Sequence, residues 1–204
     1  STDYTHFNGN IPANAVGMQA INVPARRKSM KSLLWVGASQ TALNFLNYRN
    51  SFGGGLNLNS YHAKIGSVNH PATPVEANFN VNGPGGTALN GRGEAFMELS
   101  KCFGTTGSVI GLGQLNRMNY AVRTGTAAEG RTAASTPFHF APMGLDLEAF
   151  QRTAIESGVN TADRSTPITL VLDIGTGAAG AIPEALNIDC YVSFDSLYYI
   201  DSTG

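Results

Sequence analysis

The stretch PITLVLDIG at residues 167–175, followed by LNIDCYVSF at residues 186–194, decides the fold class. Apolar residues occupy every second position in both runs, and polar residues fill most positions between them. Alternate side chains of a strand share one face of a sheet, so this period of two indicates β-structure. The polar positions predict strands with one face in a core and the other in solvent.

We expect residues 167–175 and 186–200 to be long antiparallel core strands of a sandwich. The small residues between them, 176–185, predict a mobile hairpin connection that binds no ligand.

The same stretch contains a glycine motif that is typical of nucleotide-binding turns. Residues 175–180 read GTGAAG, which matches G-x-G-x-x-G after a strand. The motif resembles the first motif of the S-adenosylmethionine-dependent methyltransferases, and Asp195 lies near the sequence distance expected of a ribose-binding acid. A nucleotide turn, however, opens a crossover of a dozen or more residues between parallel strands. Only residues 181–185, with Pro183 among them, precede the next strand, so we expect no cofactor and no helix starting at Gly177.

Composition favours a chain that is covered by neighbours. The 204 residues can form one domain with a sizeable core. Charged residues make up 13% of the chain, about half the usual share of roughly 25%. Its surface must therefore consist largely of Asn, Thr, Ser, Gly and Ala, which suits an assembly subunit. The net charge of -1 implies no general affinity for polyanions.

The two cysteines, Cys102 and Cys190, form neither a disulfide framework nor a metal-ligand pattern, and Cys190 is expected in the core. No run of 18 apolar residues predicts a membrane span, and the N-terminus does not read as a secretion signal. Because residue 1 is Ser, we expect either a removed initiator or a processed piece of a longer chain.

Residues 1–14 show no sustained period and are predicted to be an N-terminal arm, before a single domain at 15–204. Further strands are expected at 16–23, 30–36, 41–48, 60–68, 75–81, 116–122 and 138–143, with a break at Pro71 and Pro74. Helices are expected at 93–104, with Phe96, Leu99 and Phe103 on its apolar face, and at 146–150. A long exposed loop is expected at 124–137.

A basic cluster comprises Arg26, Arg27, Lys28 and Lys31. Cationic side chains of this kind can contact phosphates of nucleic acid. They can equally form a solvated turn, or bridge to an acidic patch on a neighbouring subunit. Because the cluster has few charges and no interleaved aromatic residues, we favour the second interpretation.

Sequence patterns of catalysis are missing. The chain contains no G-x-S-x-G elbow, Walker P-loop, H-E-x-x-H or C-x-x-C. His62 and His70 have no acid or cysteine partner at ligand spacing, so we expect ordinary strand or turn histidines rather than a metal site. We therefore expect no enzyme, although residues distant in sequence can converge in space.

The order of features nevertheless resembles a known family. Residues 21–35 read like I-x-V-P-[AG]-R-x-x-S-x-K-S-L-x-W, and a helix with EAFMEL at 94–99 follows. LDLEAF at 145–150, SGVNT at 157–161 and a final strand pair ending in FDSLYYID at 194–201 complete the pattern. From about Ala15 onwards the chain is similar to the C-terminal jelly roll of the major capsid proteins of adenovirus-like and Polinton-like double-stranded DNA viruses.

That resemblance implies an antiparallel jelly-roll sandwich with one or two short helices in loops. It implies a structural subunit that is made in a host cell, self-associates and builds an icosahedral virion shell with other capsid proteins. Such proteins usually carry two jelly rolls and only one fits here, so a single-jelly-roll capsid or penton-type subunit and a processed half stay open. A second hypothesis is a carbohydrate-binding jelly-roll module that uses exposed Tyr48, Tyr61 or Tyr120. A methyltransferase fragment is the third.

Overall fold

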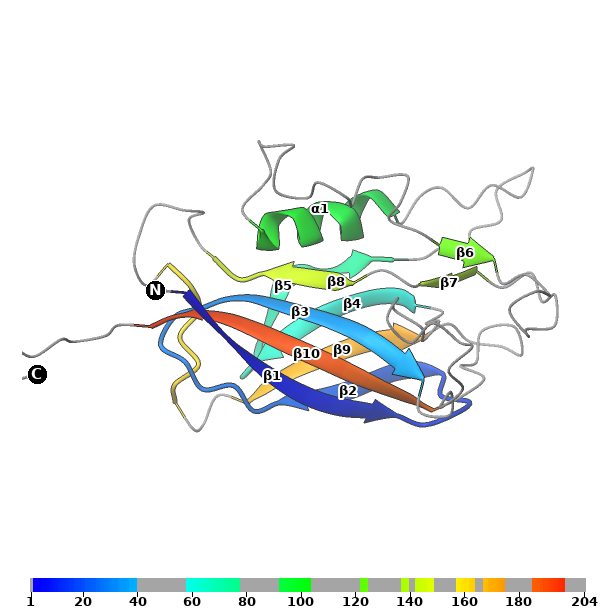
Figure 1. Ribbon diagram of the computed structural model, residues 1–204, viewed down its shortest axis with the longest axis horizontal. Coiled ribbons are helices and arrows are strands. Elements are labelled where there is room, and N and C mark those ends of the chain that lie inside the picture. The colour runs from blue at the N-terminus through cyan, green and yellow to red at the C-terminus, as the bar shows by residue number, and fades with distance from the viewer. Residues whose placement is uncertain are drawn as a thin grey trace, which may run out of the picture.

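The computed structural model describes residues 2–39, 58–77, 92–103, 122–124, 137–139, 142–148, 157–163, 167–174 and 185–196 (Figure 1). Within these ranges the strands are β1 (Thr2–Ile11), β2 (Gly17–Val23), β3 (Met30–Ser39), β4 (Leu58–Ile65), β5 (Val68–Glu76), β6 (Val122–Thr124), β7 (Pro137–His139), β8 (Met143–Asp146), β9 (Ile168–Ile174) and β10 (Leu186–Asp195). The helix in this part of the chain is α1 (Arg92–Cys102).

Eight strands form two sheets that face each other. One sheet has the order β1-β10-β3-β8 and the other the order β2-β9-β4-β5; we call them the β1 sheet and the β2 sheet. Neighbouring strands are antiparallel throughout. Along the chain, every step between these eight strands except β4 to β5 passes from one sheet to the other. This order is that of a jelly roll, so the predicted all-β sandwich is confirmed.

The core lies between the sheets and contains the alternating residues that the sequence singled out. In β9, the alternating residues Ile168, Leu170, Leu172 and Ile174 are at most 1% exposed, and in β10 the predicted inward positions are all buried. Trp35 on β3 and Tyr61 on β4 meet across the core edge to face, with ring centroids 5.6 Å apart. Burial of each such large apolar side chain stabilises the fold by about 1.5–3 kcal/mol.

The predicted hairpin between the last two strands is wrong. β9 and β10 lie in opposite sheets, so the chain between them crosses the sandwich. Each strand already has two neighbours: β9 lies between β2 and β4, and β10 lies between β1 and β3. The connecting residues 175–184 lie outside the described residues. They include Gly177, where we expected no helix to start.

The methyltransferase alternative also fails on the fold. A nucleotide turn follows a strand of a parallel sheet. β9, which precedes the glycine motif, is antiparallel to both of its neighbours. β9 therefore belongs to an antiparallel sheet and not to the parallel sheet that the methyltransferase hypothesis requires.

The N-terminal segment is a strand rather than an arm. Residues 2–11 form β1, which pairs with β10 over all ten residues. Its inward positions include Asp3, Thr5 and Gly9, and only Phe7 and Ile11 are apolar. Because β1 is an edge strand with one fully buried residue, its sequence lacks the apolar alternation that reveals a core strand.

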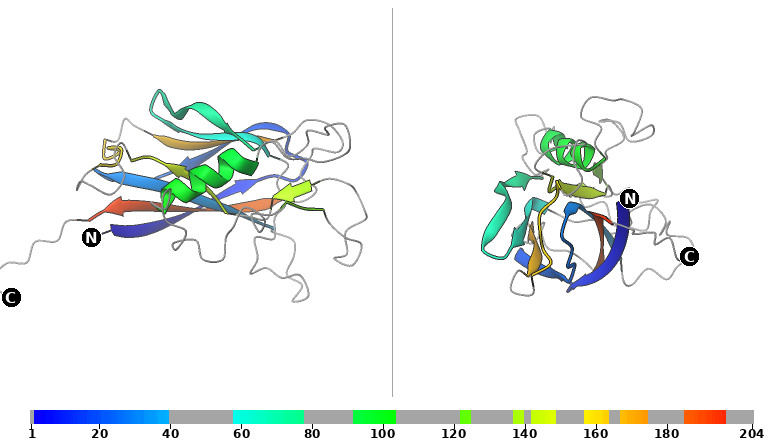
Figure 2. Two further views of the ribbon diagram at one scale, coloured as in Figure 1. Left: turned by 90° about the horizontal axis from the view of Figure 1, so that it is seen from above. Right: turned by 90° about the vertical axis from the view of Figure 1, so that its left-hand side faces the viewer.

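Helix α1 runs along one side of the sandwich, beside β8 and β5 (Figures 1 and 2). Its residues Ala95 and Leu99 are fully buried, and Lys101 pairs with the largely buried Glu98. Phe103, expected on the apolar face, is 44% exposed, because the helix ends at Cys102. No described helix is long and apolar enough to cross a bilayer, since α1 has eleven residues.

The second expected helix, at 146–150, is not formed in its described part. Asp146 is the last residue of β8, and its side chain accepts a hydrogen bond from the Glu148 backbone N–H at 3.0 Å. An aspartate in this arrangement makes a turn of the backbone rather than a first helical turn. The remaining residues, 149–150, lie outside the described residues.

The two prolines near residue 70 belong to a strand. Pro71 and Pro74 lie inside β5, at the edge of the β2 sheet, where a missing backbone N–H is tolerated. The pairing of β5 with β4 shifts there, and residues 71–74 have no counterparts in the register. The expected break is therefore a bulge within the strand. Strand 41–48, the strand at 116–121 and most of loop 124–137 lie outside the described residues.

Candidate functional site: the basic corner

The basic cluster lies where β2 leads into β3, at one end of the sandwich. Residues 157–161 run beside it: Met30 and Val159 exchange two backbone hydrogen bonds of 2.9 Å, and the Thr161 N–H donates to the Arg27 carbonyl at 2.7 Å. Gly158 fits against Met30 so closely that an added Cβ would lie 2.3 Å from the Met30 carbonyl oxygen. The 157–161 segment thus holds the backbone of residues 27–30 in place.

Lys31 forms ion pairs with two acids that are distant in the sequence. Its Nζ lies 3.1 Å from Glu148 Oε1 and 3.2 Å from Asp195 Oδ1. The side chain of Lys31 is 20% exposed, and those of both acids are 12% exposed. Burial opposes the charge on Lys31, but the hydrogen bonds and attraction of Glu148 and Asp195 outweigh it and raise the pKa of Lys31 above its ordinary value. Lys31 therefore acts inside the fold.

Two serines extend this contact into a network. Ser29 donates from Oγ to Asp195 Oδ2 at 2.9 Å, and Ser157 donates from Oγ to Glu148 Oε1 at 2.7 Å. We call the five residues Ser29, Lys31, Glu148, Ser157 and Asp195 the polar latch. The polar latch joins the start of β3, the residues after β8, the end of β10 and the 157–161 segment. Both carboxylates are thereby supplied with donors, as partly buried charges require.

Asp195 is thus a latch residue and not a ribose-binding acid. It ends β10, whereas the glycine motif precedes the start of that strand at Leu186. A ten-residue strand is about 33 Å long, so Asp195 lies far along β10 from Leu186. The glycine motif itself lies outside the described residues.

Arg27 is also turned inward. Its guanidinium carbon lies 4.1 Å from the centroid of the Phe194 ring, and its Nη2 donates to Thr5 Oγ1 at 3.0 Å. Its Nε is buried without a hydrogen-bond partner. Arg27 therefore ties β10 and β1 to the corner by stacking and by one hydrogen bond.

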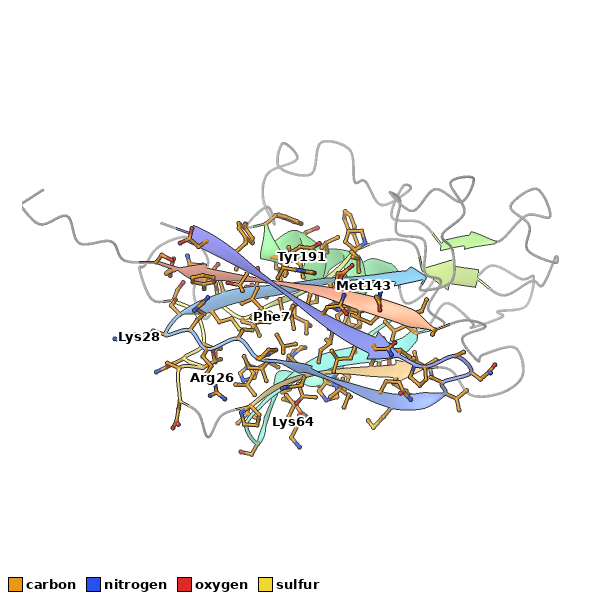
Figure 3. The ribbon with its side chains drawn as sticks, turned by 60° about the horizontal axis from the view of Figure 1, so that its bottom comes forward. Phe7, Arg26, Lys28, Lys64, Met143 and Tyr191 are labelled. Carbon is orange, nitrogen blue, oxygen red and sulfur yellow. The ribbon has the colours of Figure 1, made fainter. Side chains whose placement is uncertain are left out.

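Arg26 and Lys28 are the two members of the basic cluster that reach solvent. Arg26 donates from Nη1 to the Asp163 carbonyl at 2.9 Å and keeps an exposed side chain, and Lys28 is exposed as well. Figure 3 shows both at the same end of the molecule. The structure thus divides the four predicted site residues into an inward pair, Arg27 and Lys31, and an outward pair.

A small cleft lies next to Arg26. It is lined by residues 22–26, Pro167 and Ile168 and has a volume of about 160 Å³. Ligand pockets usually measure about 300–1,000 Å³, so this cleft is too small for a cofactor. Within the described ranges, no group of three His, Cys, Asp or Glu side chains could hold a metal ion.

The exposed aromatic side chains differ from those that the sequence suggested. Tyr61, one of the three tyrosines proposed for sugar binding, is fully buried and donates from Oη to the Gly144 carbonyl at 3.2 Å. Tyr48 and Tyr120 lie outside the described residues. Tyr4 and Tyr191, on the outer face of the β1 sheet, are 62% and 40% exposed instead.

A polar cluster lies next to Tyr191 on this face. The His6 ring is 4.9 Å from the Tyr191 ring, and His6 Nε2 lies 3.1 Å from Asp189 Oδ1. Asn8 donates from Nδ2 to the same Asp189 oxygen at 2.8 Å. Sequence reading missed this cluster because His6 and Asn8 stood in the segment assigned to an arm.

Comparison with known proteins gives a likeness of fold. No protein-family model and no curated protein matches the sequence. Among solved structures, the chain is similar to the major capsid protein P2 from bacteriophage PM2, with 10% identity and a TM-score of 0.40, over 98% of this chain and 46% of that one. It is also similar to PBCV-1 VP54, a crystal structure fitted into a cryo-EM reconstruction of the virophage Sputnik, with 12% identity and a TM-score of 0.44, over 98% and 51%.

A third similar structure is a chain of the quasi-atomic PBCV-1 virus capsid, with 11% identity and a TM-score of 0.41, over 98% of this chain and 51% of that one. The chain spans about half the length of these structures. The jelly-roll assignment itself rests on the strand order within the two sheets.

Proposed function

We propose that the chain is a structural capsid subunit that self-assembles into an icosahedral virus shell. The observation that carries the proposal is the jelly-roll order of the eight sandwich strands. Viral capsid subunits are one of the main uses of this architecture, beside lectin domains and cupins. The charged fraction of 13% favours the capsid role among these, because a surface with few charges suits coverage by neighbouring subunits.

In this proposal the partners are other copies of the chain and further capsid proteins, and the protein acts in the virion after synthesis in a host cell. Its role is structural and not enzymatic. The more specific resemblance, to the C-terminal jelly roll of the adenovirus-like and Polinton-like capsid proteins, rests on the sequence pattern quoted above. Several residues of that pattern, among them Ile21, Leu33 and Trp35, are core residues of the sandwich.

The outward pair of the basic corner is the part of the predicted site that suits a contact between subunits or with nucleic acid. Arg26 and Lys28 are exposed, and no described acid forms an ion pair with either. A neighbouring acidic patch and a phosphate backbone would both match their charge.

Particle imaging tests the proposal. Purified chain, concentrated stepwise, is expected to form rings or closed particles in negative stain and a rising scattered intensity in parallel. A homogeneous monomer at every concentration would contradict it.

A second candidate function is carbohydrate binding at the outer face of the β1 sheet. The observation that favours it is the exposed Tyr191 on the same strand as Asp189, with exposed Tyr4 on the same outer face, because aromatic faces and carboxylates are the groups that bind sugar rings and hydroxyls. A glycan array is expected to show hits that Tyr191→Ala removes and Val68→Ala retains. An array without hits would exclude this candidate.

A further inference from the structure

The edge strands on the two sides of the sandwich differ in how they are covered and interrupted. On one side, β5 and β8 end their sheets and α1 lies against both (Figures 1 and 2). The Glu94 carboxylate of α1 accepts a hydrogen bond from the Glu76 backbone N–H of β5 at 3.1 Å. Two prolines and a bulge interrupt β5 further. Cover, proline and bulges are the devices by which proteins prevent unwanted strand pairing.

The opposite side, formed by β1 and β2, has a regular edge. β1 keeps an unbroken register with β10 over ten residues, about 33 Å of strand. Residues 2–11 contain no proline and no lysine, and Asp3 is their single Asp or Glu. Along the central stretch, Tyr4–Gly9, alternate residues direct backbone N–H and C=O groups away from β10. An edge of this kind is a template for another strand.

We infer that the β1 edge pairs with the β1 edge of a second copy, antiparallel, across a two-fold axis perpendicular to the sheet. The inference rests on the proposed self-assembly and names one of its contacts. Such an axis keeps the outer faces of both copies on one side and joins the two β1 sheets into a continuous sheet.

A second copy fits this edge because β1 is compatible with itself. Antiparallel pairing centred near His6 or Phe7 brings Asp3 of one copy towards the far end of the other strand, so the two aspartates do not face each other. The remaining positions are neutral or aromatic apart from His6, and β1 carries no cation that would favour an acidic foreign strand.

Cysteine cross-linking tests the pairing. Tyr4→Cys, His6→Cys and Asn8→Cys each place a thiol on the outer face of β1, and a short bis-maleimide joins thiols close to the two-fold axis. The matched control is Val68→Cys, which is 55% exposed at the protected side. The native cysteines give little background, because burial raises the pKa of Cys190 to about 12 and also raises the pKa of Cys102.

At least one β1 variant is expected to give covalent dimers several-fold more efficiently than Val68→Cys and the unaltered chain. Amides of residues 4–9 should also exchange more slowly with deuterium as assembly proceeds, while residues 68–76 stay unchanged. Assembly without preferential cross-linking or protection at β1 would overturn the edge inference and leave the proposed function standing. A chain that stays monomeric would overturn both.

Discussion

The two pairs of cations in one basic segment point in opposite directions. Arg27 and Lys31 point into the fold, where Phe194, Thr5, Glu148 and Asp195 engage them. Arg26 and Lys28, one residue away from Arg27 on either side, point to solvent. A run of positive charge in a sequence is therefore not one surface. Its members divide between inward and solvent-exposed positions according to the direction that the local backbone gives each side chain.

The largest effect on stability is expected from Lys31→Met. The substitution leaves the partly buried carboxylates of Glu148 and Asp195 without their cation, and we expect the free energy of unfolding to fall by about 2 kcal/mol. Urea unfolding followed by circular dichroism measures it. Lys28→Met is the matched control and should leave the midpoint unchanged; equal effects of both substitutions would contradict the division of the segment.

The polar latch also predicts a response to alkaline pH. Because the pKa of Lys31 is raised in the folded state, its contribution to stability is present below the ordinary value of 10.5. That contribution is lost as pH rises through the raised value. Lys31→Met should unfold with a weaker pH dependence than the natural chain in this window, and parallel profiles would argue against the latch.

Arg27→Met should have a smaller effect. It removes the cation over the Phe194 ring and the hydrogen bond to Thr5, while the aliphatic part of the new side chain retains packing. We expect a loss of about 1 kcal/mol. Arg26→Met, the neighbouring control, should unfold like the natural chain, and the reverse order of the two variants would contradict the assigned directions.

His62, which lies outside the basic cluster, is expected to have a smaller effect on stability, and this effect depends on pH. Burial, together with the positive charge of Lys64, lowers its pKa below the ordinary 6.5. The unfolded chain therefore binds the proton more readily, and stability should decrease as pH falls below 6.5. The urea midpoint at pH 7 and pH 5 should differ less in His62→Gln than in the natural chain. An unchanged difference would show that His62 is not responsible.

The double variant Arg26→Gln/Lys28→Gln is expected to have no measurable effect on unfolding. It should instead change association, because exposed charges act at surfaces and are screened by salt. Light scattering across a series of salt concentrations should show weaker salt dependence of assembly for the variant than for the natural chain. An altered unfolding midpoint with unchanged assembly would reverse the roles of the two pairs.

The sequence predicted those strands of the sandwich in which buried and exposed residues alternate. β9 and β10 alternate between buried and half-exposed positions, so their faces could be read directly. Their partners could not, because alternation shows which face is buried and not which strand lies alongside. The hairpin prediction failed for this reason, and β1 was missed because an edge strand needs few apolar residues.

The sequence predicted where the basic cluster lies along the chain but not what each of its side chains contacts. The cluster from Arg26 to Lys31 is evident in the sequence. Its members differ because Glu148, Asp195 and Phe194, which are far along the chain, contact two of them, Lys31 and Arg27. These contacts depend on the sheet order, which no local pattern contains.

Sedimentation velocity of the purified chain over a range of concentrations tests the central claim most directly. A capsid subunit with this fold should show discrete species far larger than the 21.4 kDa chain, with their share increasing with concentration. A single 21.4 kDa species across the whole range would contradict the account.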